Sequence, residues 1–286
     1  MRYAAPSSID EAVGLMAAAD GSGRILAGGT DLLVQMRAGM VAPGLIVDVK
    51  KIAEMTTIAE SGGAYRVGAA VPAAVIGEHA KLKKLWPGVV EAINLIGSKQ
   101  VQGRASPGGN LCNASPAADS VPALVAAGAV VTVQGPKGRR DIPVEKIAAG
   151  PGKTTLERGE IVVSFTLPAR PAGSGDAYLR LIPRTEMDIA VVGCGVSLTL
   201  AKDGTCTAAR VGLGAVAPTV LLVDAAGKAL VGSKLDAKAL DAAAAACRAA
   251  CKPIDDKRGT IAYRTKIAGV LLKRATAIAA ERARSV

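Results

Sequence analysis

Two glycine-rich turns, about eighty residues apart, constrain the fold of this chain more than any other feature. They are Ala27-Gly28-Gly29-Thr30-Asp31 and Ser106-Pro107-Gly108-Gly109-Asn110. Glycine has no Cβ, so paired glycines let backbone N–H groups approach a phosphate oxygen. Two such turns suit a dinucleotide with a pyrophosphate in its middle. Two plainer interpretations stay open: Asp31 as the N-cap of an ordinary strand-to-helix turn, and a hairpin-like loop at Gly108 and Gly109.

The composition excludes several classes of protein. No stretch reaches the roughly 18 uncharged apolar residues of a membrane span, so we expect no membrane span and a cytoplasmic location. The net charge of +11 comes from 35 basic and 24 acidic residues, which are scattered along the chain. With one Trp, one Phe and four Tyr, stacking platforms for bases are scarce. We therefore expect no nucleic-acid partner, and an anionic cofactor and an acidic partner subunit explain the charge better.

The cysteine and histidine content predicts no metal site in this chain. The five cysteines are an odd number without a CxxC pair, which argues against a disulfide framework and against a zinc or iron–sulfur site. The lone His79 has no cysteine or acidic cluster nearby. No nucleophile or acid–base pair stands out, so we predict no catalytic residue.

Hydrophobic periodicity and turn residues divide the chain into three units. In the first, Ser8-Ile9-Asp10-Glu11 is a capping box that predicts a helix over 9–19. Strands at 24–27 and 45–49, with a helix at 31–38, complete this unit. The second has predicted strands at 65–69, 129–134 and 161–167 and helices at 72–82, 89–96 and 118–127. A proline- and glycine-rich linker at 168–175 then leads to a predicted three-strand meander and three helices, which is α+β in character.

Three segments, in this order, are together specific for one family. They are the first turn continued through Leu32 and Leu33, the second turn continued through Asn113 to Asp119, and Tyr178-Leu179-Arg180 followed by Arg184-Thr185-Glu186-Met187-Asp188-Ile189-Ala190. Over essentially its whole length the chain resembles the FAD-binding medium subunit of the molybdenum hydroxylases, a family that includes xanthine dehydrogenases and carbon monoxide dehydrogenase.

The resemblance implies a fold and domain limits. The fold class is α+β: a two-subdomain FAD-binding fold of the vanillyl-alcohol-oxidase type, followed by a small α+β C-terminal domain. The FAD-binding domain is expected over 1–170, with subdomains 1–56 and 57–170, and the C-terminal domain over 176–286.

It also implies the residues that hold FAD. The first turn wraps the pyrophosphate with its main-chain N–H groups, and the second binds phosphate too, although Pro107 removes one N–H donor. Asn113 and Asp119 match positions that contact the flavin and the ribose or ribityl hydroxyls in this family. Ile96 matches an apolar position near the adenine. Val163 and Arg180 lie beside the isoalloxazine ring. The full set is Leu26, Ala27, Gly28, Gly29, Thr30, Asp31, Leu32, Leu33, Ile96, Ser106, Gly108, Gly109, Asn110, Asn113, Asp119, Val163 and Arg180.

Two of these residues have plainer alternatives. Asp119 could serve only as a helix cap, and Arg180 could be a solvated strand residue.

The function implied is that of an electron-transfer subunit. FAD on this chain would take electrons from two [2Fe-2S] clusters of a small subunit and pass them to NAD+ or another acceptor. Substrate oxidation would occur at a molybdenum cofactor in a large subunit. The resemblance implies that the three subunits assemble as a dimer of heterotrimers. The alternative is a stand-alone flavin-dependent oxidase or reductase of the same fold. The substrate pocket would lie on another chain, and the Gly-Gly-Thr-Asp turn favours a heterocycle or an aldehyde over carbon monoxide.

Overall fold

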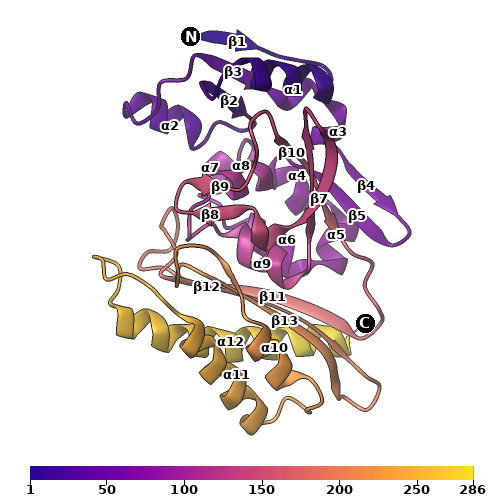
Figure 1. Cartoon of the computed structure of the whole chain (residues 1–286). Helices are drawn as coiled ribbons and strands as arrows, with labels where there is room; N and C mark the ends of the chain where they lie inside the picture. The colour runs from indigo at the N-terminus through magenta and orange to yellow at the C-terminus, as the bar shows by residue number, and fades with distance from the viewer. Residues whose placement is uncertain (286) are drawn as a thin grey trace.

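A computed structural model describes residues 1–285, which form three units along the chain (Figure 1). The first unit is a small parallel sheet with helices. Its strands, in the spatial order β1-β3-β2, are β1 (Arg2–Ala4), β3 (Leu45–Asp48) and β2 (Gly23–Leu26). Helix α1 (Ile9–Ala18) begins at the predicted cap, because the Ser8 hydroxyl accepts a hydrogen bond from the Glu11 N–H. The remaining helical segments are α2 (Leu32–Arg37), η1 (Val49–Lys51) and α3 (Ala53–Thr56).

The second unit is a five-stranded antiparallel sheet. Its middle strand is the last of the five along the chain. The spatial order is β4 (Ile58–Ser61), β5 (Ala64–Gly68), β10 (Ile161–Leu167), β6 (Val130–Gly135) and β7 (Gly138–Pro143). A bulge at Val163 interrupts the register between β10 and β6. The smaller elements are α4 (Ala73–Glu78), α5 (Ala80–Leu85), α6 (Pro87–Ile93), α7 (Lys99–Gln102), α8 (Pro107–Cys112), α9 (Ser120–Ala126), η2 (Val144–Lys146), β8 (Ala148–Gly150) and β9 (Lys153–Thr154).

Two predictions in this unit need correction. The helix predicted over 72–82 is two helices, α4 and α5. The chain leaves helical geometry at His79, where the ring Nδ1 accepts a hydrogen bond from the Leu82 N–H and caps α5. The second glycine turn is the beginning of helix α8, so the hairpin-like alternative is wrong.

The third unit is a four-stranded antiparallel sheet between helices. It contains β11 (Ser174–Leu181), β12 (Val192–Leu200), β13 (Cys206–Gly214), β14 (Leu221–Leu222), α10 (Asp224–Leu230), α11 (Ala237–Ala250) and α12 (Ile261–Arg284). Helices α10 to α12 cover one face and α9 lies on the other (Figure 1). Glycines make the α9 contact possible, because a Cβ at Gly195 or Gly212 would lie 2.5 or 2.2 Å from the Pro122 carbonyl oxygen.

Residues 1–285 form two hydrophobic cores. One joins the first and second units, and the other lies between the third sheet and its helices. Tyr178 and Val220 of the third unit pack into the first core, which ties the units together. Within residues 1–285, no helix combines the length and the apolar character that crossing a membrane requires.

Candidate functional site

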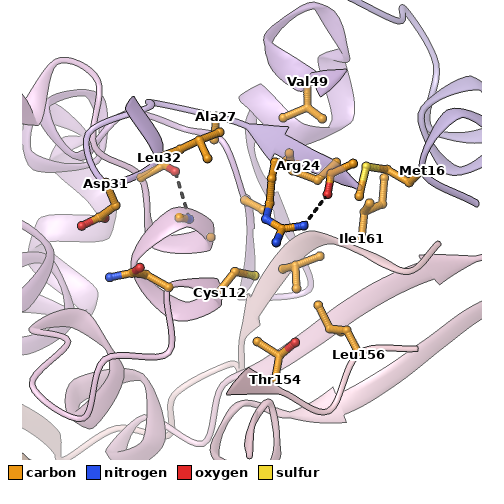
Figure 2. A pocket seen from close by; sticks show the side chains of 18 of the residues that line it. Met16, Arg24, Ala27, Asp31, Leu32, Val49, Cys112, Thr154, Leu156 and Ile161 are labelled. Atoms are coloured by element: carbon orange, nitrogen blue, oxygen red, sulfur yellow. Dashed lines mark hydrogen bonds between the residues drawn. The ribbon is translucent and has the colours of Figure 1, made fainter. Parts of the chain in front are cut away.

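A cavity of about 660 Å³ brings the two glycine turns together (Figure 2). Its volume is in the range of small-molecule and cofactor sites. Asp31 lies on one side of the view, Met16 and Arg24 on the other, and Thr154 and Leu156 come from the β9 region. The predicted site residues that line it are Ala27, Gly28, Gly29, Thr30, Asp31, Leu32, Ile96, Ser106, Gly108, Gly109, Asn110 and Asn113.

The first turn lines this cavity and carries a row of main-chain donors without partners in the described part of the chain. None of the six main-chain N–H groups from Ala27 to Leu32 has a hydrogen-bond acceptor within residues 1–285. Gly29 has φ +79°, a left-handed conformation that glycine adopts readily. Successive N–H groups around such a residue form a concave anion-binding site. Asp31 occupies the N-cap position of α2, as the plainer interpretation expected, but its side chain makes no capping hydrogen bond there.

The second turn is built differently. The Gly108 N–H donates to the Ala69 carbonyl (2.9 Å), and the Gly109 N–H donates to the Ser106 hydroxyl (3.2 Å). The Asn110 N–H donates to the Ser106 carbonyl (3.0 Å), and Pro107 has no N–H. The main-chain donors at this helix end therefore already have partners in the protein. What this turn adds to the cavity wall is the Ser106 side chain, the side-chain amide of Asn110 and the bare Cα of Gly109.

The four glycines of the turns serve different purposes. A Cβ at Gly28 would lie 1.8 Å from the Arg104 carbonyl oxygen, and one at Gly108 would lie 2.5 Å from the Ala69 carbonyl oxygen. Those two glycines are needed for the chain to pack. At Gly109, by contrast, an added Cβ would meet the Ser106 Oγ at 3.3 Å and, apart from its chain neighbours and its own helix backbone, nothing else within 4 Å in residues 1–285. Its missing side chain leaves room in the cavity, which is the space a ligand would use.

Gln35 is a cavity residue that sequence reasoning missed. Its Nε2 donates to the Asn113 Oδ1 (3.0 Å) and so joins α2 to the end of α8. The signal was weak: Gln35 lies one helical turn after Asp31, so it shares that face of α2. Arg24, Leu156 and Ile161 were also missed, because their place in the wall depends on how distant segments fold together.

Five predicted site residues lie outside the cavity wall. They are Leu26, Leu33, Asp119, Val163 and Arg180. Val163 is fully buried at the bulge of β10, and Leu33 is largely exposed on α2. Their assignment to FAD stays a prediction.

Asp119 and Arg180 pair with each other. The Arg180 Nη1 lies 2.9 Å from the Asp119 Oδ1 and also donates to the Leu95 carbonyl (3.0 Å). The Arg180 side chain is only 5% exposed, which excludes the solvated alternative. Asp119 occupies the N-cap position of α9, but its side chain makes no cap bond there and pairs with Arg180 instead, so a role as a helix cap alone is excluded. Burial raises the pKa of Asp119 to about 6, although the Arg180 charge acts in the opposite direction.

Other groups in and around the cavity fit binding better than bond-making chemistry. Cys112 is a free cysteine in the cavity wall, and no histidine lines the wall to serve as its base within residues 1–285. The Arg24 guanidinium donates to the Gly21 and Gly23 carbonyls (3.0 and 2.9 Å) and pairs with no carboxylate within residues 1–285. In the same part of the chain, no three His, Cys, Asp or Glu side chains are grouped as metal ligands. The site can hold an anionic, partly apolar ligand.

Known proteins resemble this chain in sequence and fold. The family "FAD binding domain in molybdopterin dehydrogenase" matches residues 1–170, and "CO dehydrogenase flavoprotein C-terminal domain" matches residues 177–279. The carbon monoxide dehydrogenase medium chain of Afipia carboxidovorans is 36% identical over 284 residues, 99% of this chain and 98% of that one. The xanthine dehydrogenase FAD-binding subunit of Escherichia coli O157:H7 is 30% identical over 243 residues, 84% of this chain and 82% of that one.

A solved structure agrees with these sequence matches. The crystal structure of the Cu,Mo-CO dehydrogenase in its cyanide-inactivated form has a chain with a TM-score of 0.95 and 35% identity, covering 99% of this chain and 98% of that one. The identity to the carbon monoxide dehydrogenase chain exceeds that to the xanthine dehydrogenase subunit. The expectation of a heterocycle or an aldehyde as substrate therefore gains no support here.

Fold and cavity together define an FAD-binding oxidoreductase component of mixed helix and strand content. The chain belongs to the family of FAD-binding medium subunits of the molybdenum hydroxylases, as its sequence motifs predicted.

Proposed function

We propose that this chain is the FAD-carrying electron-transfer subunit of a multi-subunit molybdenum hydroxylase. In this proposal it passes electrons from [2Fe-2S] clusters of a small partner subunit through FAD to NAD+ or another acceptor. The observation that carries the FAD assignment is the row of six N–H groups at Ala27–Leu32, which have no acceptor within residues 1–285 and belong to residues that line a cavity of cofactor size. A pyrophosphate is the part of FAD that such a row would bind.

The residues present fit FAD. The pyrophosphate would lie against the first turn, and the space left by the missing side chain at Gly109 would let it or a ribose approach α8. Apolar side chains of Ile96, Leu156 and Ile161 would exclude water from the aromatic parts. When bound, FAD supplies the ability to exchange electrons singly and in pairs. This chain binds, orients and shields it, so no acid–base residue is needed.

Partner subunits complete the proposal. Relatives are named medium chains or subunits, which supports a large molybdopterin-binding and a small [2Fe-2S] partner, assembled as a dimer of heterotrimers. We also propose the vanillyl-alcohol-oxidase type of fold, with domain limits at 1–170 and 176–286. Five free cysteines support a cytoplasmic location, because disulfides are rare in that reducing compartment.

Purification tests the proposal in two steps. The full chain, expressed alone, should show a flavin absorption doublet, and its extracted cofactor should be FAD by mass. FMN or no flavin after reconstitution would reject the FAD assignment. A tagged chain recovered from its own cell should bring two further subunits with iron and molybdenum. If the isolated, metal-free chain reduced its flavin with a hydroxylase substrate, the stand-alone enzyme would be correct instead.

A further inference from the structure

We propose that Lys50 is a positioning residue that orients the first glycine turn for the pyrophosphate. This inference rests on the proposed function and adds a residue that neither glycine turn contains. The Lys50 Nζ donates to the Ala27 carbonyl (3.1 Å), and Ala27 is the first residue after β2. Its side chain is about one-third exposed and is not part of the cavity wall.

The geometry of the peptide explains how this contact acts on the cavity. A trans peptide is planar, so its carbonyl and its N–H point in opposite directions. Holding the Ala27 carbonyl toward Lys50 therefore holds the Gly28 N–H on the opposite side. Gly28 lines the cavity, and its N–H has no acceptor within residues 1–285. Lys50 thus fixes the peptide that carries the Gly28 N–H, the second of the six donors.

A network across the edge of the first sheet holds Lys50 in place. The Asp48 Oδ1 lies 2.6 Å from the Lys50 Nζ and accepts the Lys50 N–H (3.0 Å). The Asp48 Oδ2 accepts the Tyr3 hydroxyl (2.7 Å). Tyr3 is the middle residue of β1, Asp48 ends the central strand β3, and Ala27 follows β2, so the network connects all three strands of the sheet.

The ion pair with Asp48 makes it possible to distinguish a positioning role of Lys50 from simple electrostatic attraction of phosphate. Burial acts to raise the pKa of Asp48, but the bonds from Lys50 and Tyr3 lower it overall, so the carboxylate stays charged and offsets the Lys50 charge. If Lys50 attracted phosphate only as a charge, Asp48→Asn would strengthen FAD binding. If Lys50 is a positioning residue, the same change weakens binding, because the lysine loses the partner that holds it.

Binding of FAD and of ADP to the flavin-free full chain tests the proposal. Lys50→Met should weaken both by about tenfold, which corresponds to about 1.4 kcal/mol. Lys50→Arg should restore part of the affinity. The exposed neighbour Lys51 provides the control, since Lys51→Met removes the same charge without touching Ala27. Melting temperatures of the flavin-free variants should match that of the wild type.

The experiment distinguishes failure of the Lys50 proposal from failure of the proposed function. If the wild type binds neither FAD nor ADP, the FAD assignment itself is wrong. If the wild type binds and Lys50→Met binds within twofold of it, the positioning role is overturned. Tighter binding by Asp48→Asn would overturn it as well, and this variant decides the matter if Lys50→Met does not fold.

Discussion

At the residue scale, two adjacent glycines have different roles: Gly108 is needed for packing, and Gly109 leaves space for a ligand. They are neighbours in α8, yet an added Cβ meets backbone at Gly108 and almost nothing at Gly109. The same Gly-to-Ala change should therefore have two different consequences.

We predict that Gly109→Ala keeps the flavin-free chain as stable as wild type or stabilises it by up to about 1 kcal/mol, because alanine is the better helix former. Its FAD affinity should fall, since the methyl group enters the cavity. Gly108→Ala should instead destabilise the flavin-free chain by about 1–3 kcal/mol through overpacking. Urea unfolding and FAD titration measure both effects. Unchanged FAD affinity in Gly109→Ala would mean that no cofactor approaches α8 there.

The buried Asp119 predicts a pH effect on stability. Its pKa is about 6 in the folded chain and 3.8 ordinarily, so the folded state holds the proton more tightly than the unfolded state. Stability from this group is present below pH 3.8 and is lost as the pH rises through 6. The difference between these two pKa values corresponds to roughly 3 kcal/mol of folding stability.

Asp119→Asn should abolish the loss of folding stability that accompanies rising pH. Between pH 4 and 6.5 the free energy of unfolding of the wild type should fall relative to the variant, which cannot titrate there. Denaturant unfolding at several pH values gives the difference. A constant difference across this window would show that Asp119 titrates normally, with Arg180 compensating its burial in full.

At the scale of elements, α2 depends on its neighbours. It has six residues and none of them is buried, whereas isolated helices of this length are marginal in water. Its side-chain link to the rest of the site is the bond from Gln35 to Asn113. We infer that this bond helps to hold the first turn opposite α8.

We expect Gln35→Ala to speed amide hydrogen exchange in α2 and to weaken FAD binding severalfold, while α8 keeps its protection. Gln134→Ala is the matched control, since Gln134 also bonds a side chain, Arg139, but lies in β6 outside the cavity wall. Equal exchange in α2 for both variants would contradict the role of Gln35.

At the scale of the whole molecule, local sequence patterns predicted the individual helices and strands better than they predicted how these pack together. The cap at Ser8, the strand before Gly28 and the C-terminal strands and helices follow from residues close in sequence. The insertion of β10 between β5 and β6 joins segments far apart in the chain, so periodicity could not place it. The same holds for the site: the glycine turns stood out, while Gln35 and Leu156 enter the wall only through tertiary packing.

The junction between the second and third units depends on a buried carboxylate. Asp176 on β11 accepts the Val89 N–H (3.0 Å) from α6 and pairs with Arg170 (2.9 Å). Arg170 lies 4.3 Å from the centre of the Trp86 ring, and Arg282 of α12 donates to the Asp176 carbonyl (2.8 Å). Burial raises the pKa of Asp176 while Arg170 opposes the shift.

Removing this carboxylate should loosen the junction. We predict that Asp176→Ala destabilises the chain by about 3–5 kcal/mol, because it leaves the Arg170 charge buried without its partner. Amide exchange should rise first in β11, α6 and α12, the elements that meet there. Asp203→Ala serves as the control: it breaks an exposed pair with Lys234, and exposed pairs contribute little. If the two variants unfolded at the same urea concentration, the Asp176 network would not hold the units together, and the apolar contacts of Tyr178 and Val220 would suffice.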